Sequence, residues 1–350
     1  MEYNSRLLYV GQRITVPKGG ADQVNNRNQV LLESIFDGRV DYISTSSNGI
    51  FDNIFFGVSS EVLKQIDTCI SSGQYDYVFL SHSLLGKAAR YIKKTHPRIK
   101  IITFFHNIEV QYANEYRKTN GIKAIPFYLA VKYWERVCCE NVDCYITLNK
   151  RDSKILSEVY GKTSTIELPT SFDDKYDYSK ACECASEYTP SIDYLFVGVS
   201  FFANVQGVQW FIDNVMPNVK GHFYVIGKGM DSVEFRNMTP NIHIHGFVDD
   251  LSEYYYRAHV VVSPIFVGGG MKTKTAEALM YGKTIIGTTE AFEGYQIDSN
   301  CMKLCNTKEE FLNALNSEIS NTTNKFARDL FESCHSNKMA LLKLQTVFHK

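Results

Sequence analysis

The chain has 350 residues and a formal net charge of −1, and this length suits two domains of ordinary size, each with its own core. Because basic residues are dispersed and balanced by acidic ones, the sequence shows no electrostatic footprint for nucleic acid. Nine cysteines without a C-x-x-C pair indicate reduced thiols, not a disulfide or zinc framework. The first residues lack a secretory-signal pattern and no apolar run could span a membrane, so we expect a cytoplasmic protein.

Strands and helices are expected to alternate through the first half of the chain. Strand patterns occur at 6–11, 40–45, 75–82 and 99–107, and helical patterns occur at 24–36, 59–72 and 84–96. Near-continuous apolar strands that alternate with helices predict a parallel sheet covered on both faces. In such sheets, ligands bind beyond the carboxyl ends of the strands. His82 and His106 both stand at such ends.

A long helical stretch at 125–140 carries aromatic and apolar residues at helical spacing. Such a stripe usually packs in a core. A peripheral contact with the inner membrane stays open as the alternative, although few basic residues accompany the stripe, namely Lys123, Lys132 and Arg136. Asn149 is expected to cap a helix. Residues 171–191 are polar and aperiodic, which predicts a linker after an N-terminal domain at 1–170.

The second domain, expected at 192–330, opens with a strand at 192–198. Its most informative stretch is His259–Gly294, which reads as a buried strand, a loop with three glycines, a helix at 271–282 and a second strand. These elements form one βαβ unit whose helix N-terminus directs amide N–H donors at an anion. The chain ends in helical patterns. The last, at 331–350, is long enough to cross back to the first domain.

Charged side chains in the βαβ unit suggest what it binds. Lys272 and Lys274 add two cations beside the amide donors of the loop. Glu277 lies one turn further on the same helix face, where a carboxylate suits sugar hydroxyls better than phosphate. The combination suggests a site for a sugar linked to a diphosphate. An ordinary tight turn that needs glycine is the alternative explanation of the loop.

The stretch from Pro264 to Gly294 resembles the donor-site segment of the family 4 retaining glycosyltransferases. It is most similar to the bacterial subgroup that builds capsular, exopolysaccharide and lipopolysaccharide chains. The resemblance implies the α/β GT-B fold, in which two Rossmann-like, doubly wound parallel-sheet domains face each other across a cleft. It also implies a nucleotide-diphosphate sugar as donor, a glycan or lipid-linked acceptor and no cofactor.

The resemblance extends to individual positions. His106 begins an H-N-x-E motif and would face the transferred sugar, so His106, Lys272 and Lys274 are the expected catalytic residues. Gly19 and Gly20 would approach the donor phosphates from the first domain. In the second domain, donor contacts are expected from Gly227, Lys228, Phe247, Val248, Gly268, Gly269, Gly270, Met271 and Glu277.

Two departures from the wider family concern the donor site. An Arg and a Lys that usually contact the diphosphate are replaced by Val199 and Gln206, which leaves Lys272 and Lys274 as the candidate cations. The wider family also carries two glutamates in this unit. Glu277 matches the second, and Gly269 stands where the first is expected. Backbone amides of 268–271 would then have to bind the sugar in place of that glutamate.

These observations predict a retaining glycosyltransferase of the hexosyltransferase type that builds surface polysaccharide or a lipid-linked glycan. No D-x-D ends a strand, so a metal-independent reaction is expected. The expected mechanism is front-face displacement, in which the acceptor hydroxyl attacks as the diphosphate leaves. Two alternatives stay open. One is a GT-B sugar-nucleotide epimerase or hydrolase, and the other is a catalytically degenerate GT-B protein with a binding or regulatory role.

Overall fold

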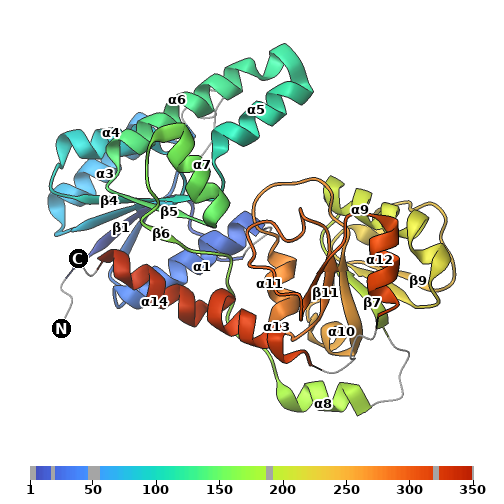
Figure 1. Ribbon diagram of the computed structural model, residues 1–350. Helices are drawn as coiled ribbons and strands as arrows, with labels where there is room; N and C mark the ends of the chain where they lie inside the picture. The colour runs from blue at the N-terminus through green and yellow to red at the C-terminus, as the bar shows by residue number, and fades with distance from the viewer. Residues whose placement is uncertain (1–4, 17–19, 46–55, 187–191, 318–322, 349–350) are drawn as a thin grey trace. The chain divides into compact units, whose positions relative to one another are not determined.

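The computed structural model describes residues 5–16, 20–45, 56–186, 192–317 and 323–348 and divides into two compact units (Figure 1). Unit 1 consists of Met1–Pro169 and Ala340–Lys350, and unit 2 of Thr170–Met339. Each unit is built on one six-stranded sheet in which all strand pairs are parallel. The two α/β units confirm the parallel sheet that the alternation of elements predicts and the two Rossmann-like, doubly wound domains that the family resemblance implies.

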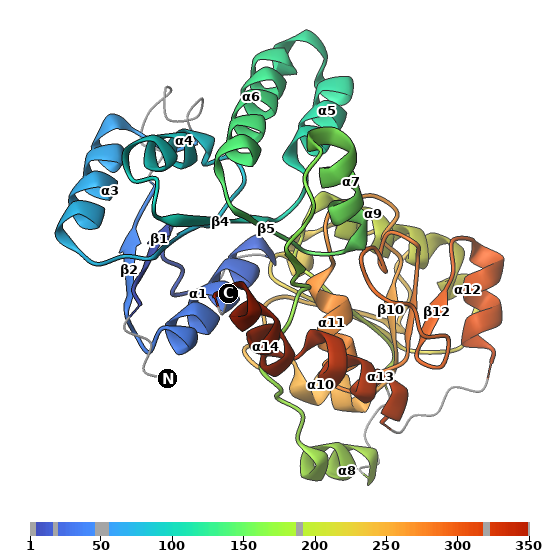
Figure 2. The same ribbon diagram turned by 60° about the vertical axis from the view of Figure 1, so that its left-hand side comes forward.

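The sheet of unit 1 has the strand order β2-β1-β3-β4-β5-β6. Its strands are β1 (Leu7–Val10), β2 (Val40–Ile43), β3 (Tyr77–Leu80), β4 (Lys100–Phe105), β5 (Cys144–Thr147) and β6 (Ile166–Glu167). Its helices before the final one are α1 (Gly20–Ile35), α3 (Ser60–Ser72), α4 (Gly86–Thr95), α5 (Glu109–Asn120), the 3-10 turn η1 (Gly121–Ala124), α6 (Ile125–Asn141) and α7 (Lys150–Tyr160). Helices α3 and α4 cover one face of the sheet, and α1 and α14 (Asn337–Phe348) cover the other (Figures 1 and 2).

Local sequence accounts for most of these elements. The apolar run of β1 is completely buried, as a central strand covered on both faces requires. Ser59 and Asn149 cap α3 and α7, because each side chain accepts a hydrogen bond from a backbone N–H of the first turn. The cap at Asn149 confirms the expectation. Helix α1 begins at Gly20, four residues before the helical pattern at 24–36.

Helix α5 has no counterpart among the helical patterns of the sequence. Only Val110 and Ala113 are buried within it, so it lacks the apolar stripe by which a surface helix is recognised. It forms a helical hairpin with η1 and α6 that extends away from the sheet of unit 1 (Figures 1 and 2). Its stability therefore depends on packing against α6 and on contacts at its first turn.

The sheet of unit 2 has the order β12-β11-β10-β7-β8-β9. Its strands are β7 (Ile192–Val197), β8 (Phe223–Ile226), β9 (Ile242–His245), β10 (Ala258–Ser263), β11 (Ile285–Gly287) and β12 (Met302–Leu304). Its helices and helical turns are α8 (Tyr178–Ser186), α9 (Phe202–Asn214), η2 (Met216–Asn218), η3 (Met230–Ser232), α10 (Ser252–Arg257), α11 (Thr273–Met280), α12 (Lys308–Leu315), α13 (Lys325–Leu330) and η4 (Phe331–His335).

The expected linker belongs to unit 2, whereas the C-terminal helix is divided between the two units. The segment 171–191 contains α8, and the bridge between Phe172 and Ser336 joins its start to the residues before α14 inside unit 2. Helix α14 begins in unit 2, and its residues from Ala340 onward belong to unit 1. There, the Phe348 carbonyl accepts a hydrogen bond from the Tyr77 hydroxyl at 3.0 Å. The C-terminal helix is thus part of the unit 1 core.

Candidate functional site

The five strands β7 to β11 of unit 2 run in parallel, so their carboxyl ends meet at one edge of the sheet, which we call the carboxyl edge. The loop between β10 and α11, 264–272, leaves this edge and contains the three glycines; we call it the glycine loop. Open α/β sheets bind ligands at such an edge. The βαβ unit predicted from the sequence is therefore present, with β10 and β11 as neighbouring strands.

The glycine loop leads directly into α11. Gly270 has a φ of +63°, a left-handed conformation that glycine adopts without steric cost. Helix α11 begins at Thr273 with Lys272 at its N-cap position, two residues later than the expected start at 271. The Tyr295 hydroxyl donates a hydrogen bond to the Lys272 carbonyl at 2.7 Å and accepts one from the Ala276 N–H at 3.2 Å. These bonds hold the helix N-terminus, the preferred place for an anion.

Lys272 is held by an ion pair. Its Nζ lies 2.6 Å from Glu290 Oε1 and donates to the Gly270 carbonyl at 2.9 Å. The Lys272 side chain is only 12% exposed, so this carboxylate already balances the positive charge at a largely desolvated place. Lys272 therefore lies where the sequence predicts a cation, and its charge is paired with Glu290.

Lys274 is the second cation of the site. Its Nζ donates to Asn204 Oδ1 at 2.6 Å and lies 4.3 Å from the centre of the Phe196 ring. A Cβ at Gly198 would lie 2.8 Å from this Nζ, so the glycine leaves room for the ammonium group. Burial, with a smaller contribution from Lys272, lowers the pKa of Lys274 to about 7. Lys274 therefore changes its charge near neutral pH.

Glu277 lies one turn beyond Lys274 on α11. Its Oε2 accepts a hydrogen bond from the Tyr255 hydroxyl at 3.0 Å, and burial raises the pKa of the Glu277 carboxyl above its usual range. Tyr255 is itself fully buried. The hydroxyl fixes one carboxylate oxygen in place. Such an arrangement suits a carboxylate that orients hydroxyl donors of a ligand.

The remaining predicted donor contacts follow β8 and β9 at the same edge. Gly227 approaches Gly198 so closely that a Cβ there would lie 2.0 Å from the Gly198 carbonyl oxygen. Lys228 is exposed. Phe247 follows β9 with a side chain that is 70% exposed, and Val248 is partly buried. The segments after β8 and β9 thus place backbone groups and one aromatic ring at the carboxyl edge.

His106 belongs to unit 1, at the carboxyl end of β4. Its Nε2 lies 3.0 Å from Asn25 Oδ1, and its ring stacks on His82 at a centroid distance of 5.4 Å. Burial lowers the pKa of His106 to about 3, so the imidazole is neutral at physiological pH. It can exchange hydrogen bonds with a sugar hydroxyl, but it supplies no positive charge to a leaving group. Gly20 starts α1 in the same unit, and Gly19 lies outside the described residues.

Beside His106, two carboxyl groups flank the start of α5. Glu109 Oε1 lies 3.5 Å from His82 Nε2, and burial raises the pKa of Glu109 to about 7. Glu135 of α6 is completely buried and accepts hydrogen bonds from the backbone N–H groups of Glu109 and Val110 at 2.8 and 2.9 Å. Glu135 thus caps α5 from a neighbouring helix.

The predicted site residues therefore fall into two groups, one in each unit. Unit 2 brings together Gly227, Lys228, Phe247, Val248, Gly268, Gly269, Gly270, Met271, Lys272, Lys274 and Glu277 at or just beyond the carboxyl edge. Unit 1 holds His106 and Gly20. Two further side chains contact the lysines: Asn204, in the first turn of α9, binds Lys274, and Glu290, between β11 and β12, binds Lys272. In the sequence, neither residue carries a signal beyond its polarity.

Within the described part of the chain, no three His, Cys, Asp or Glu side chains converge in a way that could hold a metal ion. Among the same residues, no helix is both long and apolar enough to cross a membrane. The groups described at the site of unit 2 are backbone amides of the glycine loop, Lys272 and Lys274, and the carboxylates of Glu277 and Glu290.

Residues 191–321 match the protein family described as "Glycosyl transferases group 1", and no curated protein matches the chain. Among solved structures, the chain is similar to sucrose-phosphate synthase (tll1590) from Thermosynechococcus elongatus, with a TM-score of 0.73 and 14% identity over 98% of both chains. Alr3699/HepE from Anabaena, in complex with UDP and glucose, has a TM-score of 0.67 and 12% identity over 98% of this chain and 99% of that one.

WaaG, a glycosyltransferase involved in lipopolysaccharide biosynthesis, has a TM-score of 0.67 and 14% identity over 98% of this chain and 99% of that one. Similarities at these identities establish the fold, so the chain has the two-domain Rossmann-like fold of the GT-B glycosyltransferases. The family match of unit 2 covers the whole carboxyl edge. Together, the fold and the family match support a glycosyltransferase.

Proposed function

We propose that this chain is a retaining glycosyltransferase that moves a sugar from a nucleotide-diphosphate sugar to a growing surface-polysaccharide or lipid-linked glycan. The observation that carries the proposal is the carboxyl edge of unit 2, where the glycine loop, Lys274 and Glu277 lie within the stretch that matches group 1 glycosyltransferases. The bound UDP and glucose of HepE and the role of WaaG in lipopolysaccharide synthesis support a nucleotide-sugar donor and a glycan acceptor.

The proposed reaction needs no nucleophilic side chain. The acceptor oxygen forms a bond to the anomeric carbon on the face from which the diphosphate leaves, and the hydroxyl proton passes to the departing phosphate oxygen. Backbone amides of 268–271 and the ammonium groups of Lys272 and Lys274 would stabilise the charge that develops on the diphosphate. His106, neutral in unit 1, would hydrogen-bond the transferred sugar. The reaction proposed in this way is independent of metal.

Donor binding tests the proposal directly. Thermal shifts are measured with UDP-glucose, UDP-N-acetylglucosamine and GDP-mannose, and ATP and NAD serve as comparison ligands. A donor present at a hundred times its dissociation constant should stabilise unit 2 by about 2.7 kcal/mol, which raises its melting temperature by several degrees. Glu277→Ala should remove this shift, because it deletes the carboxylate that Tyr255 orients.

Three other outcomes separate the alternatives. An unchanged shift in Glu277→Ala would remove this residue from the site. A shift with sugar turnover in the absence of any acceptor would favour an epimerase or hydrolase. No shift with any donor would favour a degenerate binding protein, a reading to which the paired state of Lys272 lends some support. His106→Ala should keep the donor shift and lose transfer, and full transfer in this variant would contradict its role.

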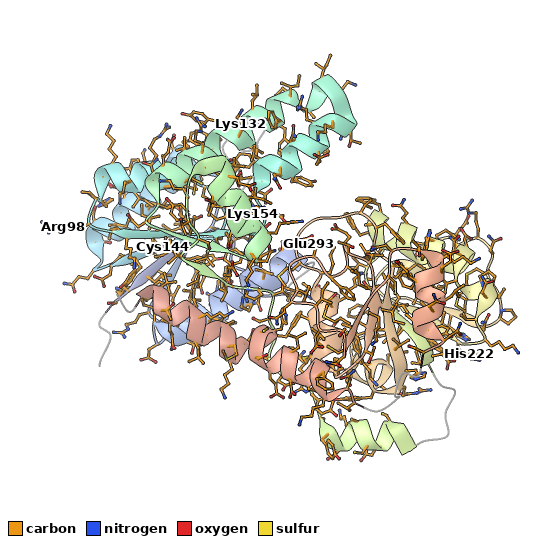
Figure 3. The ribbon with its side chains drawn as sticks, in the orientation of Figure 1. Arg98, Lys132, Cys144, Lys154, His222 and Glu293 are labelled. Carbon is orange, nitrogen blue, oxygen red and sulfur yellow. The ribbon has the colours of Figure 1, made fainter. Side chains whose placement is uncertain are left out.

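The hairpin of unit 1 supports a further part of the proposal, a peripheral contact with an anionic membrane that carries the acceptor. Ile122, Leu129 and Tyr133 are 84%, 55% and 51% exposed. We define the hairpin face as Ile122, Lys123, Ile125, Leu129, Lys132, Tyr133 and Arg136, all of which are exposed. Lys132 lies on α6 in Figure 3. Apolar side chains beside cations are the combination that binds anionic interfaces.

Vesicle co-sedimentation measures this contact. Binding to vesicles that contain phosphatidylglycerol should exceed binding to pure phosphatidylcholine. The double substitution Ile122→Ser and Leu129→Ser should weaken vesicle binding by at least about tenfold, because it removes two apolar side chains that would insert into the membrane interface. Leu342→Ser is the control, since Leu342 is 50% exposed on α14 and lies outside the hairpin. Equal binding by all variants, or none by the wild-type chain, would contradict the contact.

A further inference from the structure

One acidic side chain at the carboxyl edge has no role in the reaction as described so far. Glu290 lies in the segment between β11 and β12. Strands β10 and β11 are parallel neighbours, so the loop that follows β11 lies next to the glycine loop that follows β10. This adjacency brings Glu290 Oε1 to 2.6 Å from Lys272 Nζ.

The glycine loop is shaped around this carboxylate. A Cβ at Gly268 would lie 3.2 Å from Glu290 Oε1 and 3.3 Å from Lys272 Cε. These distances are tighter than ordinary van der Waals contact, so a larger residue at 268 would press on the ion pair. The glycine loop itself, 264–272, contains no acidic residue. Glu290 is therefore the carboxylate that lies beside Gly268 and Lys272 of the glycine loop.

The two oxygens of Glu290 differ in their surroundings. Oε1 is bound by Lys272, whereas Oε2 has no hydrogen-bond partner among the residues that the structure describes, and the Glu290 side chain is 23% exposed. An acceptor oxygen that stays open at the edge of a ligand site binds donors such as hydroxyl groups. It repels phosphate, which has the same charge. The open oxygen thus fits the sugar part of a donor and not its diphosphate.

We propose that Glu290 binds hydroxyl groups of the transferred sugar and, together with Lys272, determines which sugar the site accepts. This inference rests on the proposed function, since it assigns a substrate-binding role within the same site. Lys272 neutralises the carboxylate, so that Glu290 can lie near the diphosphate site without preventing phosphate binding. Charge-assisted hydrogen bonds to a carboxylate are stronger than those between neutral groups, so they can discriminate between sugars that differ in one hydroxyl group.

The experiment compares the binding of a sugar nucleotide with that of its nucleoside diphosphate. Isothermal titration is performed with UDP-glucose, UDP-N-acetylglucosamine and GDP-mannose, and with UDP and GDP. For the donor that the wild-type chain binds, Glu290→Gln should weaken binding about tenfold to a hundredfold. The affinity for the diphosphate alone should stay unchanged or rise, because Lys272 is released. Glu290→Asp keeps the charge but shortens the side chain, so its affinity for the sugar nucleotide should lie between those of the wild type and Glu290→Gln.

A surface variant controls for the loss of a carboxylate elsewhere on the protein, and a melting curve controls for loss of folding. Glu253→Gln removes the carboxylate of an exposed i,i+4 ion pair with Arg257 and should alter neither affinity. Equal weakening of sugar-nucleotide and diphosphate binding by Glu290→Gln would overturn the proposal and indicate a merely structural ion pair. Unchanged binding of both would overturn it as well. A wild-type chain that binds none of these compounds overturns the proposed function and this inference together.

Discussion

Replacing Lys274 with methionine is expected to lower kcat/KM for sugar transfer by about two to three orders of magnitude, the usual cost of removing one preorganised group that stabilises developing charge. The ammonium group is fixed by Asn204 and by the Phe196 ring, so it needs little reorganisation when charge develops on the leaving diphosphate. Methionine keeps most of the side-chain volume. Initial rates at subsaturating donor measure the effect.

The same lysine should impose a pH dependence. A lysine is charged below its pKa, and burial lowers the pKa of Lys274 to about 7. The cation is therefore present below about pH 7 and is lost as the pH rises. The profile of kcat/KM, which reports groups of the free enzyme, should fall above that value. Lys272 and Glu277 are the charged groups that act on Lys274, in opposite directions.

Lys274→Arg separates this cause from others, because arginine stays charged throughout the range. The variant should lose the alkaline fall even if its maximum rate is lower. A fall that persists in Lys274→Arg would assign the titration to another group, such as Glu109, whose pKa burial raises to about 7. His106 is already neutral above about pH 4, because burial lowers its pKa to about 3.

The second large effect concerns the stability of unit 1. Glu135→Ala is expected to lower the free energy of unfolding by about 3–5 kcal/mol, because it leaves several buried donors without an acceptor. The carboxylate accepts four hydrogen bonds, from the Ser83 and Tyr160 hydroxyls at 2.9 and 2.8 Å and from two backbone N–H groups at the start of α5. Among the described side chains, only Glu135 accepts hydrogen bonds from these four donors.

Chemical denaturation followed by far-UV circular dichroism measures the loss as a shift in the unfolding transition of unit 1. Glu140→Ala is the control, since Glu140 is exposed on the same helix and should change stability by no more than about 0.5 kcal/mol. Glu135→Gln should also destabilise, because an amide NH₂ would then face donors. A Glu135→Ala variant within about 1 kcal/mol of wild type would show that water replaces the carboxylate.

Much of the candidate site was predictable because most of its residues lie close together along the chain. The apolar run, the glycines, the two lysines and Glu277 lie in a short stretch, and each is related to its neighbours by strand or helix periodicity. Gly282 ends the helix as predicted, with α11 stopping at Met280 and a left-handed φ of +65° at the glycine. Outside the site, Thr307 forms a complete capping box with Glu310 at the start of α12.

Helix α5 was missed for a physical reason. Its sequence has no apolar stripe, and its first turn receives its cap from Glu135, which lies on α6. A cap supplied by another helix leaves no signal in the residues that precede the helix, where capping is normally read. The segment at 171–191 is similar, because its polar composition predicts a linker and does not reveal α8.

The sequence by itself determined the alternation of strands and helices, from which parallel sheets with candidate ligand sites at their carboxyl edges were expected. It also placed the glycine loop, both lysines and Glu277 in one unit. Only the tertiary structure decided which side chains contact the two lysines and how burial shifts the pKa values of the site residues. Lys272 meets Glu290 and Lys274 meets Asn204 across the carboxyl edge, and burial shifts the pKa of Lys274 and of His106. Such contacts join residues that are distant along the chain, so they depend on strand order and packing, which local periodicity does not encode.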